Sequence, residues 1–136
     1  MTRITLYATE PEDDAAGVLY RALRPDVDFR FVSVGEGDGY DVIREHGTPD
    51  VEGGVVLIDL FEVPADEDDA FLAGWDAARD VLAQQQGYLG ARLHRAAGPA
   101  ELRFIDLARW SSPLMVQRAA AKAIPFPSHP ALYQPV

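Results

Sequence analysis

The stretch VVLIDLFEVP, residues 55–64, is the strongest structural signal in the chain. It is nearly all apolar and ends at a proline, which predicts a strand that is covered on both faces. Asp59 is an exception within it, because a carboxylate inside an apolar strand needs a polar partner or a wet cavity. We therefore expect Asp59 to line a binding site.

An amphipathic helix is predicted directly after this strand. Asp66 can cap the helix, and the acidic residues at 67–69 suit its first turn, where the helix dipole favours negative charge. From Phe71 through Trp75 to Leu82, apolar residues recur at i, i+4, i+7 and i+11, which places them on one helix face. Trp75 is therefore expected in the core, and it is also a candidate for substrate binding.

The remaining C-terminal sequence predicts a hairpin, a short helix and a last strand. These elements are strands at 88–95 and 101–110, a helix at 113–123 and a strand around 131–134. Residues 55–136 then follow the order β-α-β-β-α-β, the split-βαβ order of a ferredoxin-like α+β fold. The helices of such a fold cover one face of the sheet. The other face also needs a cover, and a homodimer that pairs two sheets supplies it most simply.

The N-terminal sequence predicts a separate β-α-β extension. Its segments are a strand at 3–8, a helix from Pro11 to Leu23, a strand at 27–34, and a turn-rich linker at 35–54 with a short strand at 40–43. We therefore divide the chain into an extension with its linker, residues 1–50, and a ferredoxin-like domain, residues 51–136.

Composition and charge argue against several classes of protein. The 136 residues include 22 acidic and 12 basic side chains, a net charge of −10, which disfavours binding to nucleic acids and anionic membranes. Cys is absent, and three scattered His residues argue against a metal site. No signal-peptide pattern and no apolar run of ~20 residues is present, so we expect a cytoplasmic protein. Every basic residue except Lys122 is Arg, which favours a GC-rich bacterial genome.

The hairpin predicts a site if the numbers of facing residues sum to about 196. One face of the hairpin then carries Tyr88, Arg92, His94, Phe104, Asp106 and Trp110. Such a face can bind a planar phenol, because Trp110 stacks on the ring, Arg92 stabilises a phenolate and His94 removes a proton near neutral pH. The candidate catalytic residues are thus His94, Arg92 and Trp110. The candidate substrate-binding residues are Asp59, Trp75, Tyr88, Phe104 and Asp106.

Five short segments, in this order, resemble the antibiotic biosynthesis monooxygenase family of dimeric α+β barrels. The segments are VVLIDLFEVP, FLAGWDAARDVL, QQGYLGARLHR, RFIDLARW and SHPALYQPV, which together cover roughly residues 51–136. The resemblance implies a homodimer that oxygenates polyketide-type aromatic compounds, in several members without metal, flavin or haem. Relatives on this fold degrade haem, cyclise polyketides or turn over signal molecules.

Three positions depart from the patterns of that family. The haem-degrading branch has a His about ten residues after the tryptophan that ends the third strand, where this chain has Ala120. The chain also departs from the cofactor-free branch at two positions. That branch has an Asn where this chain has Asp106, and a Tyr where this chain has Val116. The resemblance therefore implies no haem, and it leaves the chemistry of the pocket to the residues present.

These observations lead to one main hypothesis and two alternatives. The main hypothesis is a cofactor-independent monooxygenase that uses O₂ on a phenolic natural-product intermediate. A first alternative is a polyketide cyclase or dehydratase, in which the same anion-stabilising pocket works without O₂. A second alternative is a non-catalytic subunit that binds a ligand or a partner in a biosynthetic complex.

Overall fold

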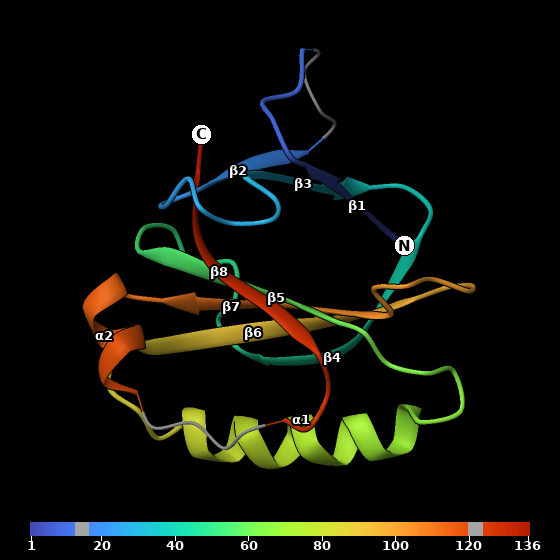
Figure 1. Ribbon diagram of the computed structural model, residues 1–136. Coiled ribbons are helices and arrows are strands. Elements are labelled where there is room, and N and C mark those ends of the chain that lie inside the picture. The colour runs from blue at the N-terminus through green and yellow to red at the C-terminus, as the bar shows by residue number, and fades with distance from the viewer. Residues whose placement is uncertain (13–16, 120–123) are drawn as a thin grey trace.

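The C-terminal part of the chain folds in the predicted β-α-β-β-α-β order. The computed structural model describes residues 1–12, 17–119 and 124–136. Its C-terminal elements are β5 (Val55–Phe61), α1 (Asp68–Leu82), β6 (Tyr88–Ala96), β7 (Phe104–Trp110), α2 (Pro113–Arg118) and β8 (Ser128–Pro135). The strands pair antiparallel in the spatial order β8-β5-β7-β6, and both helices lie on one side of them (Figure 1). The predicted α+β class is therefore confirmed.

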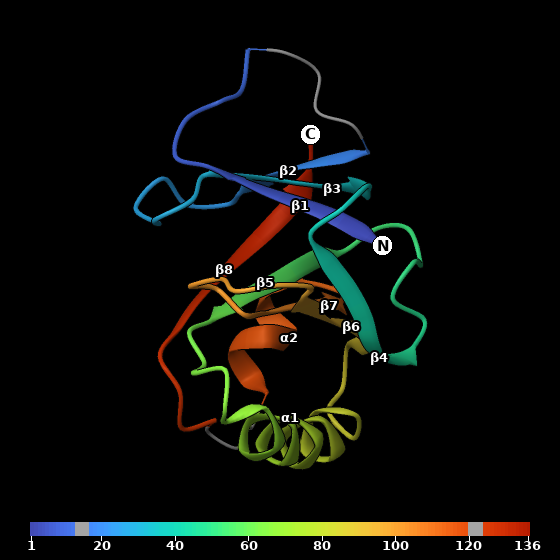
Figure 2. The same ribbon diagram turned by 90° about the vertical axis from the view of Figure 1, so that its right-hand side faces the viewer.

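The N-terminal residues add four strands to the same sheet. They are β1 (Thr2–Tyr7), β2 (Val18–Ala22), β3 (Phe31–Glu36) and β4 (Tyr40–Gly47). Strand β2 pairs with β8, β4 pairs with β6, and the single pair Thr2–Tyr40 joins β1 to β4. The described strands thus close into a barrel in the order β1-β3-β2-β8-β5-β7-β6-β4. Figure 2 shows β1, β2 and β3 as one layer and β5, β6 and β7 as the facing layer, with α1 on the far side of the second layer.

The prediction of a helix at residues 11–23 was wrong for the part of this segment that the structure describes. Residues 18–22 form strand β2, which pairs with β3 on one side and with β8 on the other, and residues 13–16 lie outside the described residues. The apolar pattern of residues 18–22 is compatible with a helix and with a strand. In the strand, the Tyr20 side chain is buried inside the barrel. Long-range pairing therefore decided the structure of this segment.

Other boundaries also differ from the predicted ones. The linker predicted at 35–54 contains the whole of β4, whose side chains are half-buried or exposed and so show no alternating apolar pattern. Helix α2 ends at Arg118, and the remainder of the predicted helix, residues 120–123, lies outside the described residues. Neither of the two described helices is long and apolar enough to cross a membrane.

The barrel interior is an apolar core built from both halves of the chain. Strands β5 and β7 contribute Val56, Ile58, Leu60 and Ile105, each at most 2% exposed. The other strands contribute Tyr20, Val32 and Tyr133. The N-terminal strands of the same chain thus cover the second face of the C-terminal sheet. The homodimer was expected because this face seemed to need a partner subunit as its cover. The homodimer remains a prediction, but this argument no longer supports it.

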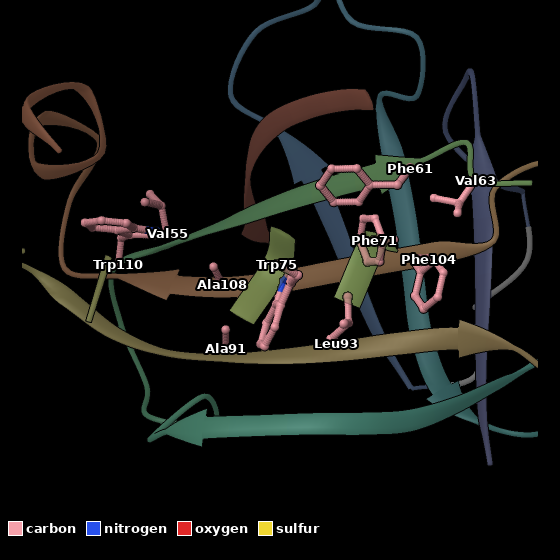
Figure 3. Packing of buried hydrophobic residues seen from close by; sticks show 10 residues of the cluster. All are labelled: Val55, Phe61, Val63, Phe71, Trp75, Ala91, Leu93, Phe104, Ala108 and Trp110. Atoms are coloured by element: carbon pink, nitrogen blue, oxygen red, sulfur yellow. The ribbon is translucent and has the colours of Figure 1, made fainter. Parts of the chain in front are cut away.

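Helix α1 covers the opposite face of the same sheet. Phe71 and Trp75 are the largest side chains it buries, and the Phe71 ring stacks on Phe104 with 4.2 Å between the ring centroids. In Figure 3, Trp75 lies between this aromatic cluster and Trp110 at the other end of the sheet. Asp66 is not the helix cap as predicted, because the N-cap residue is Glu67, which makes no side-chain capping hydrogen bond.

An ion pair fixes the start of α1 in place of a cap. Asp68 accepts hydrogen bonds from Arg103 at 2.6 and 2.8 Å, which ties the helix to the residue directly before β7. This pair therefore sets where α1 begins on the sheet face.

A substitution in the N-terminal layer tests whether the barrel unfolds as one unit. Val32→Ala removes fully buried methyl groups of β3, and we expect a loss of about 1.5–3 kcal/mol in the free energy of unfolding. Both tryptophans, Trp75 and Trp110, lie in the C-terminal part, so their fluorescence should report this loss during denaturant unfolding. Val42→Ala, at a position 43% exposed, is the matched control and should change stability by less than ~0.5 kcal/mol. An unshifted tryptophan transition in Val32→Ala would show that the two parts unfold independently.

Candidate active site between the sheet and helix α1

The register of the β6–β7 hairpin differs from the predicted one and divides the predicted site. His94 faces Ile105, so even-numbered residues of β6 face odd-numbered residues of β7. Neighbouring residues alternate between the two faces of a sheet. Arg92 and His94 therefore point toward the barrel interior, whereas Asp106 and Trp110 point toward α1. The prediction that all four share one face was wrong.

Tyr88 and Phe104 remain on the helix side of the sheet. A bulge between Tyr88 and Gly90 shifts the register, so that Tyr88 faces Trp110 with the two rings edge to face, 5.3 Å apart. Phe104 packs against Phe71 in the core and does not line the cavity that the other side chains surround. Of the predicted substrate-binding residues, Phe104 is thus the one that does not line the cavity.

A cavity of about 270 Å³ lies between the helix side of the sheet and α1. Its wall is mainly apolar and aromatic and is formed by residues that include Leu57, Trp75, Ala78, Leu82, Ala91, Ala108 and Val116. Its polar groups are Asp59, Arg79, Tyr88, Asp106, Trp110 and Ser128. An apolar cavity with a few polar groups is the usual form of a small-molecule site.

Buried polar atoms without partners are concentrated in this cavity. In the described part of the chain, six buried side-chain nitrogen or oxygen atoms lack a hydrogen-bond partner. Five of them belong to residues that line the cavity: Asp59 Oδ1, Arg79 Nε, Tyr88 OH, Asp106 Oδ1 and Trp110 Nε1. Buried polar groups are nearly always satisfied in folded proteins, and an unsatisfied group costs about 1–3 kcal/mol. Their concentration in one cavity makes this cavity the candidate functional site.

Two of these residues form a pair of neighbouring carboxyl groups. Asp59 of β5 and Asp106 of β7 are direct cross-strand partners, and both line the cavity. Directly opposed side chains in an antiparallel pair have their Cβ atoms about 4.5–5.5 Å apart. The two carboxyl groups are therefore close enough for the charge on one to disfavour the charge on the other.

Burial raises the pKa of both carboxyl groups to about 7. The charge of Asp59 raises the pKa of Asp106 further, whereas a hydrogen bond from Trp75 lowers it. The nearby His129 and the backbone N–H groups of Leu60 and His129 partly offset the burial of Asp59. The pair therefore holds about one proton near neutral pH, which suits a group that accepts and returns a proton.

The other polar groups of the cavity are hydrogen-bond donors. Burial, followed by the charge of Asp106, raises the pKa of Tyr88 to about 12, so its hydroxyl group stays protonated. Trp110 offers its indole N–H, and Arg79 offers its Nε–H. The Arg79 guanidinium also lies 5.8 Å from the centroid of the Trp75 ring and donates through Nη2 to Asp80. These donors can bind oxygen atoms of a ligand that the carboxyl pair deprotonates.

His94 and Arg92, predicted as catalytic, lie away from this cavity. Burial lowers the pKa of His94 to about 4, and its Nδ1 lies 3.3 Å from the Ile105 carbonyl oxygen. Arg92 donates to Asp50 at 2.7 and 2.9 Å and to Glu45 at 3.0 Å. The structure thus brings Asp59, Trp75, Tyr88, Asp106 and Trp110 together and separates His94 and Arg92 from them.

Arg79 was not predicted, although its sequence position carries a signal. It follows Trp75 by four residues, so the two share one face of α1. The pairing of Asp59 with Asp106 had no comparable local signal, because 46 residues (106 − 59 − 1) separate them. Only the β5–β7 register brings the two carboxyl groups into contact.

The fold is an α+β barrel with a mainly apolar cavity beside helix α1, and several solved structures resemble it. A proposed monooxygenase from Shewanella loihica is 36% identical, with a TM-score of 0.57, and the match covers 63% of this chain and 97% of that protein. A heme-degrading enzyme from Listeria monocytogenes is 17% identical, with a TM-score of 0.63, over 98% of this chain and 97% of the enzyme.

A third solved structure connects the fold to a superfamily. It is a Listeria monocytogenes ferredoxin-fold protein related to antibiotic biosynthesis monooxygenases, 14% identical with a TM-score of 0.60, and the match covers 98% of this chain and 93% of that protein. No protein-family model matches the chain, and no curated protein matches it in sequence. The chain belongs to the superfamily of these monooxygenase-like, ferredoxin-fold proteins.

The similarity to the heme-degrading enzyme raises the question of whether this cavity could hold haem. The residues that line the cavity do not fit haem. Haem iron in proteins is held by His, Cys, Met or Tyr. Of these, the described lining of the cavity includes only Tyr88, whose raised pKa disfavours the phenolate form that would bind iron. The negative charge that the Asp59–Asp106 pair carries would also repel the propionate groups of haem.

Asp106→Asn is expected to stabilise the protein at alkaline pH. Because folding raises the pKa of Asp106 from 3.8 to about 7, the folded state binds more protons than the unfolded chain between these values. The free energy of unfolding of the wild type therefore falls as the pH rises through this window. The neutral amide lacks this dependence, so at about pH 8 the variant should be more stable by on the order of 1–3 kcal/mol.

Urea denaturation at several pH values measures this difference. Asp41→Asn, at an exposed position of strand β4, is the control and should leave the pH dependence unchanged. If Asp106→Asn were less stable than the wild type at pH 8, this would contradict the claim that burial and mutual repulsion of the two carboxyl groups destabilise the folded protein at this pH.

Proposed function

We propose that this chain is a cofactor-independent monooxygenase that acts on a phenolic or enolic compound, of the kind found among polyketide-type natural products. The observation that carries the proposal is the Asp59–Asp106 pair, placed in an apolar cavity with unpartnered hydrogen-bond donors around it. The similarity to a proposed monooxygenase at 36% identity supports the same class of reaction. The aromatic wall of the cavity supports a planar substrate.

The first step is removal of the phenolic proton. The ionised member of the carboxyl pair accepts this proton, and its pKa of about 7 is close to the operating pH, as general base catalysis requires. The negative charge then lies on the substrate oxygen and, by resonance, on the ring carbon. Tyr88, Trp110 and Arg79 supply N–H and O–H donors for the substrate oxygens in a mainly apolar cavity.

The second step is reaction of the ring carbon with O₂. The phenolate transfers one electron to O₂, the two radicals combine, and a C–O bond forms to give a peroxide. The peroxide O–O bond then breaks with loss of the ring C–H proton, which leaves a carbonyl group on the substrate. One oxygen atom of O₂ enters the product quinone and the other leaves as water, with the protons from the phenol and from the ring carbon. The substrate supplies all the electrons, so the step needs no further reductant.

A cyclase or dehydratase reaction is the second candidate function. A carboxyl pair that shares one proton contains an acid and a base side by side, and both are needed to form an enolate and to expel water. This reaction would use the same cavity and the same donors. It differs in that O₂ is not consumed.

Oxygen uptake on hydroxylated naphthalenes and anthrones tests the proposal. We expect wild-type protein to consume O₂ in step with quinone formation, and Asp106→Asn to lower the rate about 10²–10⁴-fold, the usual cost of losing a general base. The variant is expected to be folded and stable, so a loss of rate would not come from unfolding. Turnover that continues equally under strict anaerobiosis would replace the monooxygenase by the second candidate.

Two control variants separate the cavity from the rest of the sheet. Asp41→Asn removes an exposed carboxyl group and should leave the rate unchanged. His94→Gln alters a buried side chain on the barrel side of the sheet and should also retain the rate, provided that the protein folds. A rate that depends on His94 and not on Asp106 would move the chemistry to the other face of the sheet.

A further inference from the structure

The polar groups of the cavity beside α1 are gathered at two places along β7. The pair of Asp59 and Asp106 marks the first place, which we call the carboxyl end of the cavity. Trp110 and Tyr88, which face each other on β7 and β6, mark the second place. Trp110 follows Asp106 by four residues, and a strand rises about 3.3 Å per residue, so the two places are roughly 13 Å apart along the strand.

Arg79 lies with Tyr88 and Trp110 at the second place, and we call these three residues the donor end. Trp75 donates a hydrogen bond to Asp106, and Arg79 lies one helical turn beyond Trp75, toward the end of α1 that leads to β6. Burial and the charge of Asp106 raise the pKa of Tyr88, and the nearby charge of Arg79 acts in the opposite direction. Arg79 is also the only cationic side chain in the described lining of the cavity.

Small side chains form the floor between the two ends. Ala91 of β6 and Ala108 of β7 are cross-strand partners, and both line the cavity. Figure 3 shows this pair between Trp110 and Trp75. Two methyl groups in place of larger side chains leave space above the sheet here. The cavity of about 270 Å³ is lined by residues of both ends, so a single ligand can extend from one end to the other.

The donor end has hydrogen-bond donors that lack acceptors. Arg79 Nε, Tyr88 OH and Trp110 Nε1 are buried and have no hydrogen-bond partner in the described part of the chain. Arginine and indole N–H groups can only donate, so an oxygen atom without a proton of its own matches this end. A ketone oxygen is such an atom and is neutral. A carboxylate fits less well, because Arg79 already pairs with Asp80 at 3.0 Å and the carboxyl end retains a negative charge.

We propose that the substrate of this cavity is an elongated hydroxyaryl ketone with fused rings, its hydroxyl group at the carboxyl end and its ketone oxygen at the donor end. This inference rests on the proposed function, because it specifies the substrate of the same cavity. The fused rings extend over Ala91 and Ala108, beside the aromatic side chain of Trp75. Ala91 and Ala108 are therefore specificity-determining residues, since larger side chains there would shorten the cavity.

Calorimetric titration with three naphthols that differ only at carbon 6 tests this assignment. The compounds are 6-acetyl-2-naphthol, 6-isopropenyl-2-naphthol, which has CH₂ in place of the ketone oxygen, and 6-hydroxy-2-naphthoate, which is an anion. Titration under nitrogen prevents oxidation by O₂. We expect the acetyl compound to bind at least about tenfold more tightly than either of the others, because it alone brings a neutral acceptor to the donor end.

The outcomes separate this inference from the proposed function. Equal affinity for the acetyl and isopropenyl compounds, or tighter binding of the naphthoate, would overturn the ketone assignment and leave the cavity as a phenol site. If none of the three naphthols bound at millimolar concentration, both the ketone assignment and the proposed phenolic substrate would be wrong.

Tyr88→Phe removes one donor and keeps the ring. Because the lost hydroxyl group has no partner in the described part of the chain, the variant should fold. We expect it to reduce the preference for the acetyl over the isopropenyl compound at least about threefold, mainly by weakening binding of the acetyl compound. Tyr40→Phe is the matched control, since its hydroxyl group donates to the Leu102 carbonyl oxygen at 2.9 Å, away from this cavity, and it should keep the full preference. An unchanged preference in Tyr88→Phe would contradict the assigned donor end.

Ala108→Val tests the length of the cavity. The larger side chain narrows the floor between the two ends, so we expect both the acetyl and the isopropenyl compound to bind at least about tenfold more weakly. Ala100→Val, at an exposed position of the loop between β6 and β7, is the matched control and should bind both compounds as the wild type does. Wild-type affinity for both compounds in folded Ala108→Val would show that the ligand does not extend over this floor.

Discussion

Strand β5 buries both of its faces, and this constraint organises the rest of the molecule. Its side chains alternate between the barrel interior, which receives Val56, Ile58 and Leu60, and the side covered by α1. A single layer of helices can cover only one of these faces. The four N-terminal strands cover the other, and they do so by joining the ends of the same sheet at β8 and β6. The barrel is therefore the consequence of a strand that has no face for solvent.

The sheet also divides the polar chemistry of the molecule into two compartments. Asp59 and Asp106 face α1, whereas His94 and Arg92 face the barrel side. On one side, two buried carboxyl groups that form no ion pair with any described residue hold about one proton between them. On the other side lie a neutral imidazole and the ion pair of Arg92 with Asp50. The register of β6 against β7 assigns each residue to its compartment, and the bulge at Tyr88 returns that ring to the side of α1.

The comparison structures differ in how much of this chain they match. The Shewanella protein corresponds to 63% of the chain, whereas the two Listeria proteins correspond to 98% of it. The fold of the longer proteins therefore includes a counterpart of the N-terminal strands. In this chain those strands fill the barrel with Tyr20 and Val32, so the interior does not depend on a second copy for its apolar contacts.

The sequence by itself determined the elements whose periodicity is strong and local. The apolar run at 55–63 predicted β5, the i, i+4, i+7 spacing from Phe71 predicted α1, and their order predicted the ferredoxin-like arrangement. Asp59 was also identified from sequence, because a charge in an apolar strand is conspicuous. Tertiary structure alone decided that residues 18–22 are a strand and that Asp106 lies beside Asp59 and not beside His94. The physical reason is that a strand is stabilised by its partners, and a register shift by an odd number of residues exchanges the two faces of a sheet without changing the local pattern.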